Sequence, residues 1–125
     1  MLGSKIAVAT LPVRHLPTAR LFYEEKVGLE IAFMHEPNAI AYKAGNSIVL
    51  VYESTYGGTN NATAVTWVVD DDMAVLVAEL KQRGVAFQHY DLPGITREGD
   101  IHHAGALQQA WFKDPDGNIH GLASG

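Results

Sequence analysis

The sequence predicts an α+β fold, a single domain made of two successive βαβββ modules at about residues 4–53 and 62–124. Three observations lead to this prediction. The chain has 125 residues, 47% of them hydrophobic, which allows one compact core but not two independent domains. A shift of 56 residues aligns residues 8–11 with residues 64–67 and continues without a gap, which indicates an internal repeat. Each copy then runs in the same order, from a β-rich stretch to a helical pattern, a glycine and further strands.

In the first copy, Pro17 suits the opening turn of a helix, and Gly28 suits the left-handed position just after its end. The helix carries an apolar face between these two residues. Strand-like segments follow the glycine, with a turn at residues 36–38. The predicted strands cover residues 31–35, 39–44 and 48–52.

In the second copy, an acidic run at residues 70–72 is expected to cap a helix and to place negative charge at the positive end of its dipole. The apolar stripe of this helix ends at Gly84, the repeat equivalent of Gly28. A linker at residues 54–61 joins the copies. The predicted strands cover residues 86–90, 109–113 and 119–122.

The copies differ at residues 91–107, DLPGITREGDIHHAGAL, which form a far longer stretch than their counterpart. We interpret this stretch as a long loop. Long loops in compact domains are usually functional lids or mobile segments, although a disordered excursion is the alternative.

Composition excludes several classes of function. The absence of cysteine removes disulfides, thiolate nucleophiles and cysteine-ligated zinc. Nine basic residues against fourteen acidic ones, without a basic cluster, argue against a nucleic-acid partner. The start of the chain lacks the pattern of a secretory signal, and no apolar run is long enough to span a membrane, so we expect no membrane partner and a cytoplasmic location. Small molecules or proteins are the expected partners.

Several segments, in this order along the chain, carry a family resemblance. They are Phe22-Tyr23 with Gly28-Leu29, residues 67–71 (WVVDD), Leu80 with residues 83–85 (RGV), and residues 110–118 (AWFKDPDGN). Together they resemble the vicinal oxygen chelate superfamily, which contains glyoxalases, bleomycin-resistance proteins and extradiol dioxygenases. The resemblance implies paired βαβββ modules whose sheets curl into a cup, and a homodimer. In the metal-dependent members, four inward-pointing His, Glu or Gln side chains hold one divalent ion.

Those four positions carry over to Val8, Ala64, Gly121 and a residue in the strand at 48–52. The last is Leu50 by the spacing of the family and Val49 by the internal repeat. None of these side chains offers a carboxylate, imidazole or amide oxygen to a divalent ion. The sequence therefore predicts no metal and no other cofactor.

Strand alternation and the positions implied by the family together predict the residues that line the cup. A mostly apolar lining with a few hydrogen-bonding groups is typical of a pocket for a flat or apolar small molecule. In such a pocket, Gly121 would leave room for the ligand. The alternative is a cup filled by its own side chains. The predicted lining consists of Val8, Thr10, Leu50, Tyr52, Ala64, Thr66, Val68, Gln109, Trp111, Ile119 and Gly121.

Catalytic candidates are His102 and His103 in the long stretch, and Glu53 at the rim of the cup, since each could transfer a proton. A solvated loop is the alternative for the two histidines. His120, next to Gly121, is expected to face the helices as a packed core residue. Trp67 is also expected in the core, against the second helix.

These observations leave three functions open. The leading hypothesis is a metal-independent protein of sequestration or resistance type that binds an apolar or aromatic molecule in its cup. The second is a lyase, isomerase or dioxygenase-like enzyme that uses a loop histidine, or a non-standard metal site made by His102, His103 and His120. The third is an interaction scaffold without a ligand.

Overall fold

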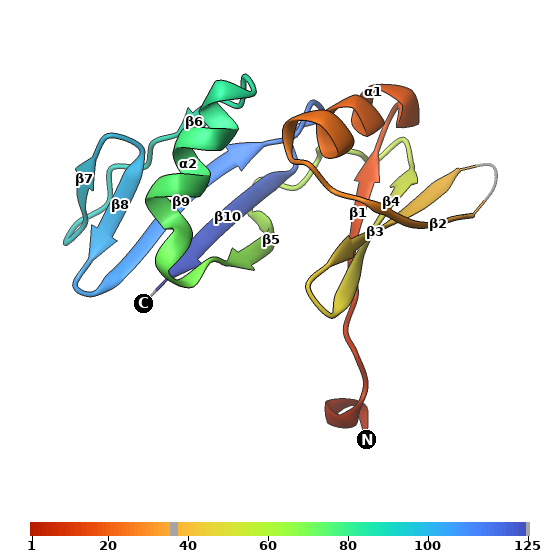
Figure 1. Cartoon of the computed structure of the whole chain (residues 1–125), viewed down its shortest axis with the longest axis horizontal. Coiled ribbons are helices and arrows are strands. Elements are labelled where there is room, and N and C mark those ends of the chain that lie inside the picture. The colour runs from red at the N-terminus through yellow and green to blue at the C-terminus, as the bar shows by residue number, and fades with distance from the viewer. Residues whose placement is uncertain (36–37, 125) are drawn as a thin grey trace.

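The computed structural model describes residues 1–35 and 38–124, which form two β-sheets that lie side by side (Figure 1). In the first sheet, the strand order is β1-β4-β3-β2, and β1 runs parallel to β4 while the other pairs are antiparallel. Residues 36 and 37, where a turn is predicted, lie outside the described residues. The strands are β1 (Ala9–Val13), β2 (Ile31–His35), β3 (Ala39–Ala44) and β4 (Ser47–Glu53).

The second sheet repeats this topology, with β5 parallel to β10 and the order β5-β10-β9-β8-β7. The short strand β6 pairs with the same edge of β9 as β8 does. In both sheets the first strand of the module runs parallel to its last strand, and an antiparallel strand follows beside it, which supports the internal repeat. The strands are β5 (Thr63–Val68), β6 (Phe87–Gln88), β7 (Thr96–Glu98), β8 (Ile101–Ala104), β9 (Leu107–Lys113) and β10 (Ile119–Ser124).

The first helical segment consists of α1 (Leu16–Arg20), with Pro17 in its first turn, and the π-helical turn η2 (Leu21–Lys26). The first free amide of α1, that of Leu16, donates to the Glu53 carboxylate at 3.1 Å. After the segment ends, Gly28 has a φ of +77°, the left-handed conformation that glycine adopts without strain.

The second helix, α2 (Met73–Gln82), follows a 3-10 turn, η3 (Asp70–Asp72). Asp72 is the N-cap residue of α2, but its side chain makes no capping hydrogen bond, so the predicted cap is wrong in this detail. The three carboxylates still lie at the positive end of the helix dipole. Gly84 has a φ of +88° after the helix ends, as Gly28 does after the first one.

The prediction of a long loop at residues 91–107 is wrong, because this stretch contains the antiparallel pair β7 and β8. Gly99, with a φ of +61°, lies in the turn between the two strands. The adjacent Asp100 ties the hairpin to α2, since its carboxylate contacts Lys81 Nζ at 2.8 Å and His89 Nε2 at 2.7 Å. The hydrogen bonds from Lys81 and then His89 hold the pKa of Asp100 below its ordinary value.

The main hydrophobic core lies between the helices and the faces of the sheets that they cover, and strand alternation selects its members. In β4, for example, Val49 and Val51 are buried while Leu50 points away. The largest apolar contributors are Leu11, Val13, Phe22, Tyr23, Ile40, Tyr42, Met73, Val77, Leu80, Phe112 and Leu122.

The two modules are joined by the turn between β9 and β10. Asp116 in this turn accepts a hydrogen bond from the Arg14 backbone at 3.0 Å, and Asn118 Nδ2 donates to the Pro12 carbonyl at 2.7 Å. The Asp114 carboxylate closes the turn, because one of its oxygens accepts the backbone amides of residues 116, 117 and 118. The turn is therefore a joint between the halves as well as a hairpin connection.

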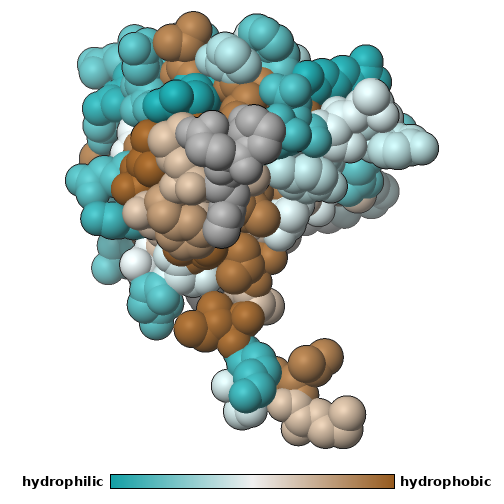
Figure 2. All heavy atoms as spheres, turned by 90° about the vertical axis from the view of Figure 1, so that its right-hand side faces the viewer, coloured by the Kyte–Doolittle hydropathy of each residue, from teal (hydrophilic) through white to brown (hydrophobic). Residues whose placement is uncertain are grey.

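The first residues form an arm that extends away from both sheets (Figures 1 and 2). It contains a 3-10 turn, η1 (Leu2–Ser4), and its apolar side chains are exposed; Ile6, for example, is 75% exposed. The first strand begins at Ala9, where pairing with Val49 starts. None of the described helices has the length and apolar character needed to cross a membrane.

Candidate functional site

The faces of the two sheets that point away from the helices carry the predicted cup residues; we call this surface the open face. Thr10 lies beside Leu50 in the register of β1 and β4, and Gly121 lies between Thr66 and Trp111 in the second sheet. Because Val49 is buried on the helix side, the residue of β4 on the open face is Leu50. Of the two registers that the sequence left open, the structure therefore selects Leu50.

The residues predicted to line the cup differ widely in exposure, so the open face of a single chain is only partly covered. Val68 is 76% exposed, whereas Ile119 and Gly121 are buried. Val8 lies in the arm, just before β1. Val8, Thr10, Ala64 and Thr66 are exposed, and Leu50, Tyr52, Gln109 and Trp111 are half-buried.

The structure gives a different reason for Gly121 from the one that the sequence suggested. A Cβ atom at this position would lie 3.3 Å from Nε1 and 3.4 Å from Cδ1 of Trp111, and 3.4 Å from the Thr63 methyl group. The absence of a Cβ atom therefore lets the Trp111 indole approach the backbone closely; room for a ligand beside Gly121 stays a prediction.

The residues at the four chelating positions do not fit a metal ion. The structure keeps Leu50 and Gly121 on the open face, and neither these side chains nor Val8 and Ala64 carry an oxygen or nitrogen donor. Within residues 1–35 and 38–124, no group of three or more His, Asp or Glu side chains is arranged to hold an ion. We therefore assign no step of any reaction to a metal.

The two candidate histidines lie in strand β8, where alternation points their side chains to opposite faces. His102 is only 2% exposed, and its Nε2 accepts the Tyr90 amide at 3.0 Å. A solvated loop is therefore excluded for His102. His103 is half-buried and pairs in register with Gln108. These two histidines and His120 do not come together as a non-standard metal site.

An aromatic cluster forms around His102 on the second sheet. The His102 ring lies edge-on to Trp111 at 4.8 Å, and Tyr90 lies edge-on to Trp111 at 5.2 Å. Since Nε2 of His102 accepts a hydrogen bond, the neutral ring carries its proton on Nδ1, and this buried atom has no partner among the described residues. Tyr90, which precedes the stretch at residues 91–107, is not among the residues predicted to line the cup; it lies shortly after β6, where Gln88 pairs with Trp111.

Glu53, the other catalytic candidate, has a structural role. It is exposed at the end of β4, and its carboxylate accepts the Leu16 amide at the start of α1. An acidic group at this place stabilises the positive end of the first helical segment. Its use as a general base stays a prediction.

His120 faces the helices, as predicted, and it is fully buried. Trp67 Nε1 donates to its Nδ1 at 3.1 Å, so the neutral ring carries its proton on Nε2, which lies 2.9 Å from the Tyr23 hydroxyl. The Tyr23 hydroxyl in turn donates to Asp114 at 2.7 Å. We call this chain of Trp67, His120, Tyr23 and Asp114 the buried relay.

Burial sets the charge states of the buried relay. It lowers the pKa of His120 from its ordinary value of 6.5 to about 4, since the imidazolium would lose its hydration. Burial, and then the Asp114 carboxylate, raise the pKa of the Tyr23 phenol. Both groups are therefore neutral at pH 7, and the relay serves as a fixed hydrogen-bonded core.

Comparisons with known proteins agree with the fold. The structure matches a glyoxalase/bleomycin resistance protein/dioxygenase from Alicyclobacillus acidocaldarius with a TM-score of 0.72 and 21% identity, over 97% of this chain and 91% of that chain. It matches a lactoylglutathione lyase from Agrobacterium tumefaciens with a TM-score of 0.71 and 16% identity, over 98% and 94% of the chains. A fosfomycin resistance protein from Mesorhizobium loti matches with a TM-score of 0.69 and 13% identity, over 98% and 92%. At these identities the matches show the fold alone.

A search of curated proteins by sequence found no significant match. The model of one protein family, described as the Glyoxalase/Bleomycin resistance protein/Dioxygenase superfamily, matches residues 5–120. That span includes both helices, the joint between the modules and every described strand except most of β10. The chain therefore belongs to the glyoxalase/bleomycin resistance protein/dioxygenase superfamily.

Proposed function

We propose that this protein binds a small apolar or aromatic molecule on its open face, without a metal ion, and acts by sequestration or resistance. The observation that carries the proposal is the chemistry of the four chelating positions. The chain belongs to the superfamily, but its side chains at these positions provide no metal donor. The four residues are Val8, Leu50, Ala64 and Gly121. The surface around them is apolar, and such a surface binds a ligand by removing it from water.

The residues of the open face supply both affinity and orientation. Trp111 offers an aromatic edge next to Gly121, and Leu50 offers an aliphatic surface. Thr10, Thr66 and Gln109 provide hydrogen-bonding groups around this apolar surface. Because Trp111 already fills the space over Gly121, the ligand is expected to lie against the indole and not beneath it.

We further propose that the ligand site is completed in a homodimer. A single chain leaves apolar side chains of the open face and of the arm in water, including Val68 at 76% and Ile6 at 75% exposure. A symmetric partner that covers them would bury apolar area and enclose the ligand. Light scattering coupled to gel filtration tests this point, and a monomer at all protein concentrations would contradict it.

Binding can be tested by thermal-shift screening of neutral aromatic compounds, followed by isothermal titration of the compounds that stabilise the protein. The variant Ala64→Leu places a larger side chain on the exposed part of the open face and should weaken binding roughly tenfold, because the new side chain takes space from the ligand. Ala78→Leu makes the same change on the exposed surface of α2 and should leave binding unchanged. Equal affinity in both variants, or no binding compound in the screen, would refute the proposal.

A further inference from the structure

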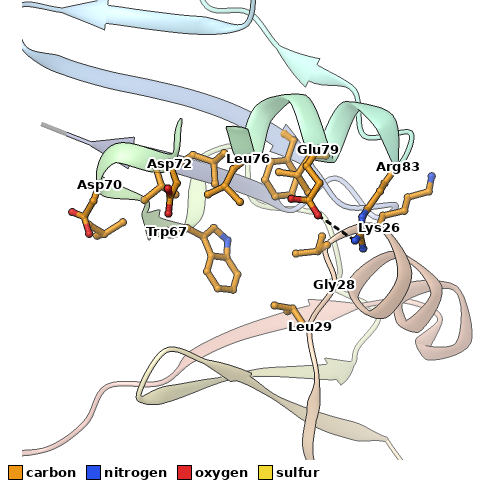
Figure 3. A pocket seen from close by; sticks show the side chains of 15 residues that line it. Lys26, Gly28, Leu29, Trp67, Asp70, Asp72, Leu76, Glu79 and Arg83 are labelled. Atoms are coloured by element: carbon orange, nitrogen blue, oxygen red, sulfur yellow. Dashed lines mark hydrogen bonds and ion pairs between the residues drawn. The ribbon is translucent and has the colours of Figure 1, made fainter. Parts of the chain in front are cut away.

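A cleft lies between the two modules, on the side of the second sheet that carries α2. It is separate from the open face. Its volume is about 420 Å³, within the range of small-molecule sites. One wall is the segment after η2, with Val27, Gly28 and Leu29, and the other is formed by α2. Figure 3 shows the Trp67 indole between Leu76 of α2 and Leu29 of the first module.

The aromatic wall of this cleft is held in place from behind. Trp67 is half-buried, and its Nε1 donates to the fully buried His120 at 3.1 Å. The indole therefore presents a fixed apolar surface to the cleft, with its polar atom already satisfied. Such a surface favours a flat apolar group and needs no ordering of the side chain when a ligand binds.

The charges of the cleft are separated between its ends (Figure 3). Lys26 and Arg83 lie at one end together with Glu79, and Asp70 and Asp72 lie at the other. A ligand with one negative group is therefore directed toward the Lys26 end and away from the two aspartates.

At the end of the cleft with Lys26 and Arg83, some N–H donors remain available to a ligand. Arg83 is positioned by bonds from Nη1 to the Glu25 carbonyl at 3.0 Å and from Nη2 to Glu79 at 3.2 Å, which leave other guanidinium N–H groups available. In the described part of the chain, no hydrogen bond or ion pair engages the Lys26 ammonium group. Its Nζ lies near the end of α2, since a Cβ atom on Gly84 would be 3.7 Å away.

We propose that this cleft is a second ligand site, for a small aromatic carboxylate whose ring lies against Trp67 and whose carboxylate contacts Lys26 and Arg83. The ligand would touch both modules at once, since Lys26 and Leu29 belong to the first module and Trp67 and Arg83 to the second. The site is independent of ligand binding on the open face.

The two tryptophans provide one reporter for each site, because Trp67 lines the cleft and Trp111 lies on the open face. Their indole N–H signals in ¹⁵N-labelled protein can be assigned with Trp111→Phe. 4-Phenylbutyrate should shift the Trp67 signal in a saturable way and leave the Trp111 signal unchanged. The neutral analogue 4-phenylbutanamide should bind more weakly, since it lacks the charge.

Lys26→Gln removes an ammonium group that has no partner among the described residues, and it should weaken binding of 4-phenylbutyrate roughly fivefold, the range of one exposed charge pair. Lys5→Gln, which removes an exposed lysine from the arm, should leave the affinity unchanged. Equal weakening in both variants, or equal affinity for the amide and the acid, would overturn the proposal. The proposal would also be overturned if the probe shifted only the Trp111 signal, or neither signal. A Trp67 signal that moves with protein concentration in the absence of probe would overturn it as well, because it would indicate that a second copy of the chain occupies the cleft.

Discussion

Protonation of His120 should make the fold less stable as the pH falls, because this ring is fully buried in the folded protein. The ordinary pKa of 6.5 applies to the unfolded chain, whereas burial holds the folded value at about 4. Between these two values the unfolded chain binds one more proton than the folded protein. The contribution of His120 to the free energy of unfolding is therefore full above pH 6.5, falls as the pH drops toward 4, and decreases no further below that value.

The magnitude follows from the difference between the two pKa values, which corresponds to about 3 kcal/mol. The surroundings of the ring explain why the folded protein resists the proton. Trp67 donates to Nδ1, so an added proton at this atom would face another donor, and the ring is stacked on Phe112 at 4.9 Å. The Tyr23 hydroxyl contacts the other nitrogen, and its own proton is directed to Asp114.

Urea unfolding at a series of pH values between 7 and 4 would measure the effect, with His120→Gln as the comparison. Glutamine can accept from Trp67 and donate to Tyr23, but it does not titrate. The variant should be less stable at pH 7, yet it should lose about 3 kcal/mol less than the unmodified protein on acidification to pH 4. Because carboxylates titrate in both proteins, their contribution cancels. Parallel stability curves for the two proteins would refute the reasoning.

Two further predictions compare matched variants. Tyr23→Phe should cost about 3 kcal/mol of unfolding free energy, because the buried hydroxyl contacts both Asp114 and His120. Tyr42→Phe should cost only about 1 kcal/mol, because Glu24 keeps its bond to Arg20. Equal costs in urea unfolding would contradict the role of the buried relay. Gly58→Ala should lower the free energy of unfolding by at least about 2 kcal/mol more than Gly45→Ala, as measured by thermal unfolding. Both glycines have positive φ, but only at Gly58 would the new Cβ overlap the Asp116 carbonyl. Similar melting temperatures for these two variants would show that the approach of the two backbones is not a tight constraint.

The modules could be predicted from the sequence because their signals are local. The 56-residue repeat and the glycines after each helix mark the same places in both halves, and Gly28 and Gly84 both have positive φ. Strand alternation correctly placed His120 on the helix side. The hairpin at residues 96–104 was missed because two adjacent histidines do not show the apolar alternation of a strand, although Gly99-Asp100 offered a turn signal.

The candidate site was harder to predict, because it depends on contacts across strands. The position of Trp111 beside Gly121 could have been found by counting outward from the turn. Lys113 pairs with Ile119, and two residues further along each strand Trp111 pairs with Gly121 on the same face of the sheet. The cleft lined by Trp67 and Leu29 could not have been found in this way. It exists because two modules pack at a particular angle, and no local pattern encodes that angle.

The joint between the modules also bears on how the chain acquires its structure. Pro12 lies in β1 and Arg14 follows directly after it, but their partners Asn118 and Asp116 lie 106 and 102 residues further along the chain. During synthesis, the first half must therefore wait for nearly the whole chain before it can satisfy these backbone groups. The repeated halves are expected to fold slowly and as one cooperative unit, in spite of a sequence that suggests two equal building blocks.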